Sequence, residues 1–208
     1  MVGVPGAGKG TQAKKISQKF NIAHISTGDI LRSEIKKETL LGVEADEYLK
    51  KGKLVPDDVI IEIIKSEIIR DESMGGFLMD GFPRNLKQAV MFSNILDELG
   101  LKLDKVINIV VDKNEIIKRL DSRRVCINCK RIYSFDNLDD KNIVKCPHCG
   151  GKLIKRKDDS ADIIKKRLAV YEKETKPLIN YYDGKNLLVN IDGMGTEQEV
   201  TERILNCL

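Results

Sequence analysis

Several features are missing from the sequence. No stretch approaches the roughly 18 apolar residues of a membrane span, and no apolar signal region follows the first residues, so we expect a cytoplasmic protein with no membrane partner. The 36 basic and 32 acidic residues leave a net charge of only +4, which does not favour a nucleic-acid partner. Only two histidines are present, and no Ser-His-Asp or Cys-His arrangement is evident, so nucleophilic catalysis of that kind is not expected.

The chain of 208 residues is long enough for one core with small insertions, and no repeat or low-complexity linker divides it. Apolar periodicity alternates between strand and helix character, which predicts a parallel sheet covered by helices on both faces. Strands are predicted at 23–26, 76–80, 105–111 and 187–191, and helices at 9–20, 27–37, 41–51, from Pro56, and at 86–99, 113–124, 160–182 and 196–208. Residues 125–157 break this pattern and form an insertion.

The carboxyl ends of the strands are the expected ligand site, because ligands of such sheets bind there. The loop at Gly3, the turn at Ser26, Asp80 and the turn after Val111 should therefore meet. We interpret His24, within a short strand, as a packing residue.

A glycine-rich loop, GVPGAGKGT at residues 3–11, stands directly before the first predicted helix. Its glycines allow backbone N–H groups to surround phosphate oxygens, and the helix adds its positive N-terminal end. Lys9 supplies a mobile cation for the β and γ oxygens of a nucleotide. The alternative is an ordinary glycine-rich turn, which the position of the lysine disfavours.

One position departs from the usual phosphate loop. The residue after the lysine is normally Ser or Thr, a magnesium ligand, whereas here it is Gly10 and Thr11 follows. Asp80 ends a buried strand, so its carboxylate should face the loop across the sheet and hold Mg²⁺ through water. The alternative for Asp80 is a strand-end cap of the next turn.

The loop resembles that of adenylate kinases, members of the nucleoside monophosphate kinase family. The resemblance continues through nearly the whole chain, in the same order of motifs. These motifs are ISTGDILR (25–32), KLVPDDV (53–59), DGFPR (80–84) with Gln88, RRV (123–125) and RKDDSADIIKKRL (156–168). The resemblance implies one α/β phosphate-loop kinase domain over 1–208, with a helical monophosphate-binding subdomain at 26–55 and a lid at 122–159.

The resemblance also assigns the residues of each nucleotide site. ATP would be bound by Gly6, Ala7, Gly8, Lys9, Gly10, Thr11, Arg119, Arg123, Ile132, Tyr133 and Gly195. AMP would be bound by Thr27, Gly28, Arg32, Lys53, Leu54, Val55, Gly81, Phe82, Pro83, Arg84, Gln88, Arg156 and Arg167. The catalytic set would be Lys9, Arg84, Arg119, Arg123, Arg156 and Arg167.

Guanidinium groups suit this reaction, because they neutralise the charge that repels two nucleotides and that spreads over the transferred group. Residue chemistry supports only the type of the six arginines of these sites, since a single arginine is more often a solvated surface charge; they are Arg32, Arg84, Arg119, Arg123, Arg156 and Arg167. The amide of Gln88 has the donor and acceptor that an adenine edge requires, although an exposed helix position is its alternative.

Four of the five cysteines form two pairs, Cys126/Cys129 and Cys146/Cys149, with sixteen residues between them. This spacing is typical of four-thiolate zinc ribbons, which close the coordination shell and are structural. Two disulfides or a redox pair are the alternatives. By resemblance the segment is the lid over ATP, with Asp158 and Asp159 at its return hinge. A segment this small has little core, so one Zn²⁺ would stabilise it.

Only two residues precede the loop, whereas the family carries about four more, apolar ones in the central strand. Each missing buried side chain would cost about 1.5–3 kcal/mol. We therefore expect a less firmly anchored loop and reduced stability.

The sequence thus predicts a monomeric, Mg²⁺-dependent enzyme with one structural Zn²⁺ that catalyses ATP + AMP ⇌ 2 ADP, with no nucleic-acid partner. A kinase for UMP, CMP or GMP is the nearest alternative, which an acceptor panel would distinguish. A zinc-ribbon nucleic-acid-binding protein with a vestigial loop, and a catalytically inactive nucleotide sensor, are two others.

Overall fold

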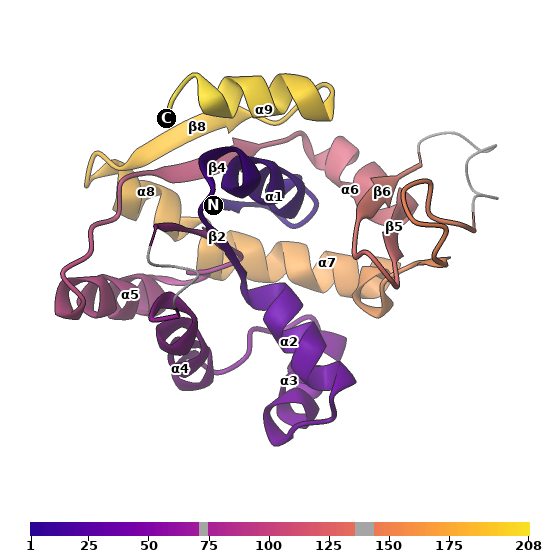
Figure 1. Ribbon diagram of the computed structural model, residues 1–208, viewed down its shortest axis with the longest axis horizontal. Helices are drawn as coiled ribbons and strands as arrows, with labels where there is room; N and C mark the ends of the chain where they lie inside the picture. Colours follow the sequence, from indigo (N-terminus) through magenta and orange to yellow (C-terminus); the bar gives the residue numbers. More distant parts are fainter. Residues whose placement is uncertain (71–74, 136–143) are drawn as a thin grey trace.

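The computed structural model describes residues 1–70, 75–135 and 144–208. Parallel strands lie in the middle of the molecule between helices, and two groups of elements project from this body (Figure 1). In chain order the elements are β1 (Val2–Gly3), α1 (Lys9–Phe20), β2 (Ala23–Ser26), α2 (Thr27–Lys36), α3 (Leu40–Lys50), α4 (Asp57–Ile68), β3 (Phe77–Asp80), α5 (Leu86–Glu98), β4 (Val106–Val110), α6 (Lys113–Ser122), β5 (Arg123–Cys126), β6 (Ile132–Ser134), β7 (Leu153–Ile154), η3 (Lys157–Asp159), α7 (Ala161–Val170), η4 (Tyr171–Thr175), α8 (Pro177–Asp183), β8 (Leu188–Asp192) and α9 (Glu197–Leu205).

The central strands pair in parallel, as the sequence predicts. One ladder has the order β1-β4-β8, and a second joins β2 to β3. The amino group of Met1 donates to the carbonyl oxygen of Met79 in β3 (2.6 Å), so the start of β1 also contacts the second ladder. The carboxyl ends of these strands therefore meet at one edge, where the glycine loop lies.

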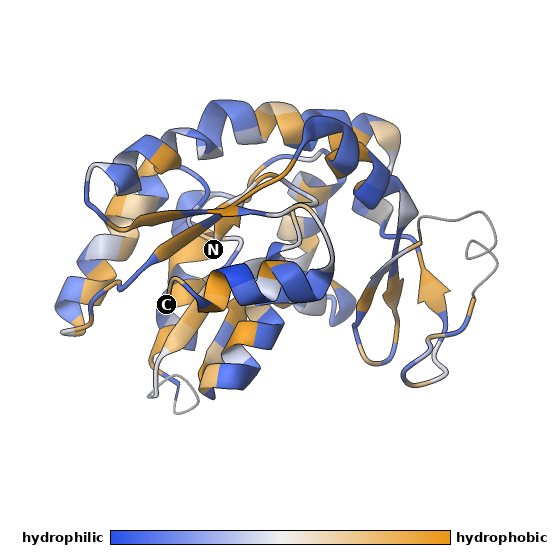
Figure 2. Cartoon of the chain, turned by 90° about the horizontal axis from the view of Figure 1, so that it is seen from above, coloured by the Kyte–Doolittle hydropathy of each residue, from blue (hydrophilic) through white to orange (hydrophobic). Residues whose placement is uncertain are grey.

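The two largest apolar clusters of the described residues lie on the two parts of the sheet. One packs β2 and β3 against α2 to α5, with Ile64 and Phe92 among its fully buried side chains. The other packs β4 and β8 against α1, α6 and α9, with Ile109 and Leu120 at its centre. Figure 2 shows the strands as mainly hydrophobic and the helices as two-sided, as expected for helices that cover a sheet.

Most predicted boundaries are confirmed. All four predicted strands agree with β2, β3, β4 and β8 to within one residue at each end. Several helices begin at side-chain caps; for example, the Ser26 side chain accepts from the N–H of Asp29, and Thr196 and Glu199 form a capping box before α9.

Two helix predictions were wrong. The helix predicted at 113–124 ends at Ser122, because Arg123 has an extended backbone and starts the antiparallel strand β5. The long helix predicted at 160–182 is interrupted by a π-helical turn, in which the N–H of Lys176 donates to the carbonyl of Tyr171 (2.9 Å). Pro177 follows that turn and lacks the N–H that a regular helix would use there.

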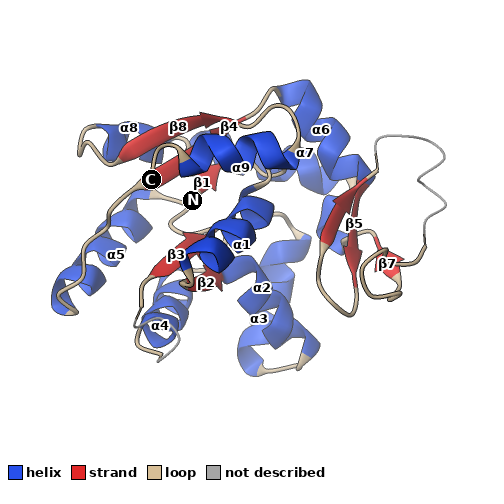
Figure 3. Cartoon of the chain, turned by 45° about the horizontal axis from the view of Figure 1, so that its top comes forward, coloured by secondary structure: helices blue, strands red, loops and turns tan. Residues whose placement is uncertain are grey.

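The inserted segment forms its own small sheet, with the strand order β6-β5-β7, at one end of the molecule (Figure 3). Helices α2 and α3 form the second projection, on another side of the body (Figures 1 and 3). Among the described residues, no helix combines the length and the apolar character needed to cross a membrane.

Candidate active site and metal centre

The glycine loop surrounds the ammonium group of Lys9. Gly8 has a φ of 92°, which glycine adopts without strain, and α1 begins at the next residue. The Lys9 Nζ atom donates to the carbonyl oxygens of Gly3 (2.7 Å) and Val4 (3.0 Å). Burial lowers the pKa of Lys9 to about 8, against the opposing effect of Asp80. The loop therefore holds a buried cation at the edge of the sheet.

The carboxylate of Asp80 lies against Gly10. A Cβ atom at Gly10 would come within 3.1 Å of Asp80 Oδ2, so the carboxylate occupies the space that a Ser or Thr side chain would enter. Burial tends to raise the pKa of Asp80, but His24 and Lys9 lower it below its usual value. A buried carboxylate beside a phosphate loop is a suitable partner for hydrated Mg²⁺, and the residues present fit that ion.

His24, which we interpret from the sequence as a packing residue, lies beside Asp80 in the structure. Its Nε2 atom lies 3.7 Å from Asp80 Oδ2, beyond hydrogen-bond distance, and has no hydrogen-bond partner among the described residues. The ring therefore faces the carboxylate rather than serving only to fill space.

Thr27, Gly81 and Arg84 form the opposite wall of the site. The hydroxyl of Thr27 donates to the carbonyl of Gly81 (3.0 Å), and Arg84 Nε donates to the same carbonyl (2.6 Å). Gly81 has a φ of +78°, and a Cβ there would approach both Thr27 Oγ1 and the Arg84 guanidinium at 3.1 Å. Glycine at this turn therefore allows both side chains to reach the site.

Gln88 is almost completely buried, at 2% exposure, so the alternative of an exposed helix residue was wrong. Its Oε1 atom accepts from the backbone N–H of Arg84 (2.8 Å), and its Nε2 atom donates to Asp57 Oδ1 (2.8 Å). Both ends of the side-chain amide are thus held by the protein.

One cavity brings the glycine loop and the predicted AMP residues together. It is open to solvent and is lined by Gly3, Lys9, Gly28, Arg32, Lys53, Leu54, Gly81, Pro83, Arg84, Asp158 and Arg167, among others. A smaller pocket adjoins it and is lined by Thr27, Leu31, Val55, Ile60, Phe82 and Gln88, besides shared residues. Within the described chain, the two linings include none of the predicted site residues Gly6, Ala7, Gly8, Gly10, Thr11, Arg119, Arg123, Ile132, Tyr133, Arg156 and Gly195.

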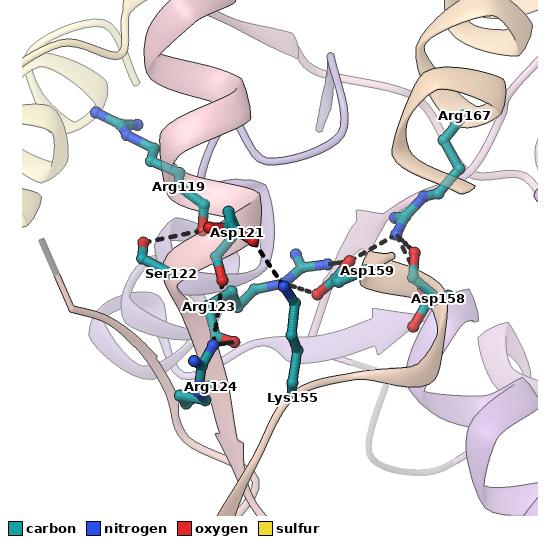
Figure 4. A network of polar contacts seen from close by, with 9 residues as sticks. All are labelled: Arg119, Asp121, Ser122, Arg123, Arg124, Lys155, Asp158, Asp159 and Arg167. Atoms are coloured by element: carbon teal, nitrogen blue, oxygen red, sulfur yellow. Dashed lines mark hydrogen bonds and ion pairs between the residues drawn. The ribbon is translucent and has the colours of Figure 1, made fainter. Parts of the chain in front are cut away.

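Two arginines share one buried carboxylate where the inserted segment returns to the body. Asp159 is fully buried, and it accepts from Arg123 Nε (2.7 Å) and from Arg167 Nη1 (3.1 Å). Arg167 also pairs with Asp158 (2.9 Å). Figure 4 shows Asp159 between the two guanidinium groups, while Arg119 points away from it. This arrangement ties β5, η3 and α7 together by charge-assisted hydrogen bonds.

Arg84 and Arg156 are partly buried and have no such partner. Burial lowers the pKa of each to about 10, and Arg167 and Arg32 respectively add to this effect. In the described ranges, no carboxylate lies within ion-pair distance of either residue, and Arg156 Nε has no hydrogen-bond partner. A bound anion would supply the missing partner.

Arg119 lies at a separate part of the site. Its Nε atom donates to Glu115 (2.7 Å), and its Nη2 atom donates to the carbonyl of Gly193 (3.1 Å). It therefore contacts the loop that ends in Gly195, so two of the predicted ATP residues belong to one corner of the molecule.

The four cysteines of the predicted zinc site come together. Their sulfur atoms all lie within 4.8 Å of one another, with 3.4 Å between Cys126 and Cys149 and 3.6 Å between Cys129 and Cys146. Tetrahedral Zn²⁺ with Zn–S bonds of about 2.3 Å places sulfurs about 3.8 Å apart. The residues fit a closed, structural Zn²⁺ site.

Tyr133 belongs to this centre. Its hydroxyl lies 3.1 Å from Cys146 Sγ, and its ring stacks on Phe135 with the centroids 6.0 Å apart. The Tyr133 side chain thus points at the sulfur cluster. If Tyr133 contacts a nucleotide, it would do so through its backbone.

Two residues that contact the site were missed as contributors. Asp57 accepts a hydrogen bond from the Gln88 amide. The sequence analysis includes Asp57 in the motif KLVPDDV but predicts no role for it. Thr175 donates from Oγ1 to the carbonyl of Arg84 (2.7 Å). Pro177 could have indicated that the helix around Thr175 is interrupted. No sequence signal indicates that Thr175 contacts Arg84, because the two residues are 91 positions apart in the chain.

Comparisons with known proteins agree with this geometry. A family model described as adenylate kinase matches residues 1–187. The adenylate kinase of Caldicellulosiruptor bescii is 46% identical over 208 residues, which is all of this chain and 97% of that protein. The adenylate kinase of Methanocella arvoryzae is 48% identical over 97% of this chain and 93% of its own length. That of Archaeoglobus fulgidus is 47% identical over 92% and 88%, respectively.

Proposed function

This chain belongs to the adenylate kinase family and is thus a phosphotransferase acting on ATP, AMP and ADP, and from this premise we propose how its residues divide the reaction ATP + AMP ⇌ 2 ADP. The observation that carries the proposal is the single cavity that Lys9 of the glycine loop shares with Arg84 and Arg167. Donor and acceptor phosphates can meet there without a covalent enzyme intermediate.

The donor site is built from the glycine loop and the elements around it. Backbone N–H groups of Gly6 to Thr11 surround the phosphates of ATP, and Lys9 moves from the Gly3 and Val4 carbonyls to the β and γ oxygens. Asp80 holds the water shell of Mg²⁺, which when bound neutralises charge between the β and γ phosphates. Arg119 and Arg123 contact the phosphates of ATP, while Gly195 and the backbone of Ile132 and Tyr133 contact the rest of the nucleotide.

The acceptor site is the pocket beside the cavity. Arg32 and Arg84 bind the phosphate of AMP, while Gln88 hydrogen-bonds the edge of the base. The base lies near Thr27, Gly28 and the backbone of Lys53, Leu54 and Val55, with Gly81, Phe82 and Pro83 at its other side. The buried position of Gln88 in that pocket supports this assignment.

The transfer step depends on four partly buried arginines. Arg84, Arg123, Arg156 and Arg167 neutralise the charge of the moving phosphoryl group, and their partial burial reduces the solvation that they must lose at that moment. Residues 122–159 act as the lid that excludes water, and residues 26–55 as the AMP-binding subdomain of a single domain. Zn²⁺ on the four cysteines keeps the lid rigid.

We propose a monomer in the cytoplasm with no nucleic-acid or membrane partner. Size-exclusion chromatography with light scattering tests the assembly, and a mass of two chains or more would contradict it.

The function is tested by ADP formation from ATP with AMP, CMP, UMP or GMP as the acceptor. Turnover confined to AMP is the expected result. Efficient turnover with another acceptor would assign the chain to a different nucleoside monophosphate, and none with any acceptor would contradict the proposed roles of its residues.

A further inference from the structure

Asp57 contacts Gln88 from behind the acceptor pocket. It is the first residue of α4, and its Oδ1 atom accepts from Gln88 Nε2 (2.8 Å) and from Asn85 Nδ2 (3.0 Å). Its other oxygen lies 3.4 Å from Lys87 Nζ. Gln88 lines the pocket, whereas Asp57 does not. Asp57 can therefore influence a bound base only through the amide of Gln88.

The two partners of Gln88 leave its amide only one orientation. The backbone N–H of Arg84 can only donate, so it requires the carbonyl end of the amide. An ionised carboxylate can only accept, so Asp57 requires the NH₂ end. Burial tends to raise the pKa of Asp57, but hydrogen bonds from Asn85 and Gln88 lower it below its usual value, which keeps the carboxylate ionised. A flipped amide would place like groups against each other at both ends.

The fixed amide retains one N–H and one lone pair of Oε1 for a ligand. Adenine presents an amino group at position 6 and an acceptor at N1, which match that lone pair and that N–H. Hypoxanthine and guanine present the reverse pattern, an oxygen at position 6 and a hydrogen on N1. They could pair with Gln88 only if its amide were flipped.

We propose that Asp57 is a positioning residue that determines base specificity, because it locks the Gln88 amide in the orientation that accepts a 6-amino purine and rejects a 6-oxo purine. The proposal rests on the assignment of the acceptor base to Gln88 in the proposed function. A buried polar group left unpaired by the wrong base is the usual source of strong discrimination of this kind.

The test is Asp57→Asn, which keeps the shape of the side chain but can donate as well as accept. Inosine monophosphate is the probe, since it differs from AMP only at position 6 and N1. We expect the ratio of kcat/KM for inosine monophosphate to that for AMP to rise by about tenfold or more. The matched control is Asp58→Asn, which removes an exposed acid from the same turn of α4 and should leave the ratio unchanged.

An unchanged ratio in a folded Asp57→Asn variant would overturn the proposal, as would an equal rise in Asp58→Asn. Circular dichroism and thermal unfolding establish whether the variant is folded, and Asp57→Ser, whose hydroxyl also donates and accepts, replaces it if it is not. Gln88→Ala separates the two levels of inference. If it leaves the KM for AMP unchanged, the base site itself is misassigned; if it raises this KM while Asp57→Asn leaves the ratio unchanged, only the role of Asp57 is refuted.

Discussion

Arg123 and Arg167 share the buried carboxylate of Asp159, and we call this paired set the lid side, whereas Arg84 and Arg156 are partly buried with no carboxylate partner in the described ranges, and we call this unpaired set the acceptor side, although Arg156 itself lies within residues 122–159. The lid side is thus neutralised by the protein itself. The acceptor side keeps positive charge that is partly withdrawn from water and has gained no anion, which is costly in the free protein.

The difference separates two tasks. A paired arginine fixes the position of the lid hinge before any nucleotide arrives, and its own stabilisation depends on the pair. An unpaired one is poised to gain most of its favourable interaction when a phosphate enters. If this distinction is correct, changes on the lid side should reduce stability, and changes on the acceptor side should reduce turnover.

Removal of zinc should have the largest effect, and it should be confined to the lid side. Among the described residues of the lid, the apolar core consists of Cys126, Cys146 and Leu153, with Cys129, Tyr133 and Phe135 against it, so we expect the metal to supply most of its stability. Structural Zn²⁺ contributes about 10–16 kcal/mol in small domains. We expect chelation to abolish hydrogen-exchange protection in 123–135 while protection around α4 and α5 persists.

Metal analysis should find one Zn²⁺ per chain, and Cys146→Ser should reproduce the effect of the chelator. Retention of full lid protection in protein that contains no zinc would contradict the structural role.

Arg84→Met should show the acceptor-side behaviour. Methionine keeps apolar volume but removes the charge, so we expect turnover to fall by about 10³-fold, as for other cations that stabilise phosphoryl transfer. The free protein should be no less stable, because the lost charge was buried and unpaired. Steady-state kinetics and thermal unfolding without nucleotide check both parts together.

A variant with normal turnover would remove Arg84 from the reaction. A large loss of stability with intact turnover would reverse the assignment of the two sides.

Asp159→Asn should show the lid-side behaviour. It leaves the partly buried Arg123 without a carboxylate and Arg167 with Asp158 alone, which should cost up to about 3 kcal/mol of unfolding free energy, as measured in urea. The control is Asp121→Asn, which breaks an exposed pair with Lys155 (2.7 Å) and should cost less than about 1 kcal/mol. Equal effects of the two substitutions would show that the buried pair contributes no more than a surface one.

The sequence predicts the acceptor side better than the lid side, for a physical reason. Gly81, Arg84 and Gln88 lie within a single turn region, so their contacts are local and a motif can encode them. The shared carboxylate joins residues 36 positions apart, and it depends on Arg123 leaving its helix. Periodicity extended that helix to 124, because nothing in the local pattern records the tertiary pairing of β5 with β6 and β7.

Thr175 and Asp57 illustrate the same limit. Each contacts a site residue that is distant in the chain, Arg84 in one case and Gln88 in the other. The cysteine spacing, in contrast, contains the whole zinc site, so the sequence was sufficient to predict it.

Raising the pH should have the smallest effect on activity, and it tests the role of Lys9 in the glycine loop. Burial lowers the pKa of Lys9 from 10.5 to about 8, so this ammonium is charged at pH 7 and loses its proton as the pH rises through 8. Arg84 and Arg156, whose pKa values burial lowers to about 10, remain largely charged over the same range. We expect kcat/KM for ATP to fall by about tenfold between pH 7 and pH 9, since this ratio reports ionisation in the free enzyme.

Lys9→Arg should have lower activity but a flat profile between pH 7 and pH 9, because a guanidinium keeps its proton there. A fall of the same size in both proteins would mean that another group titrates. The acceptor side gives an independent check within the same experiment. The KM for AMP should stay constant over this range if Arg84 and Arg32, rather than Lys9, hold its phosphate.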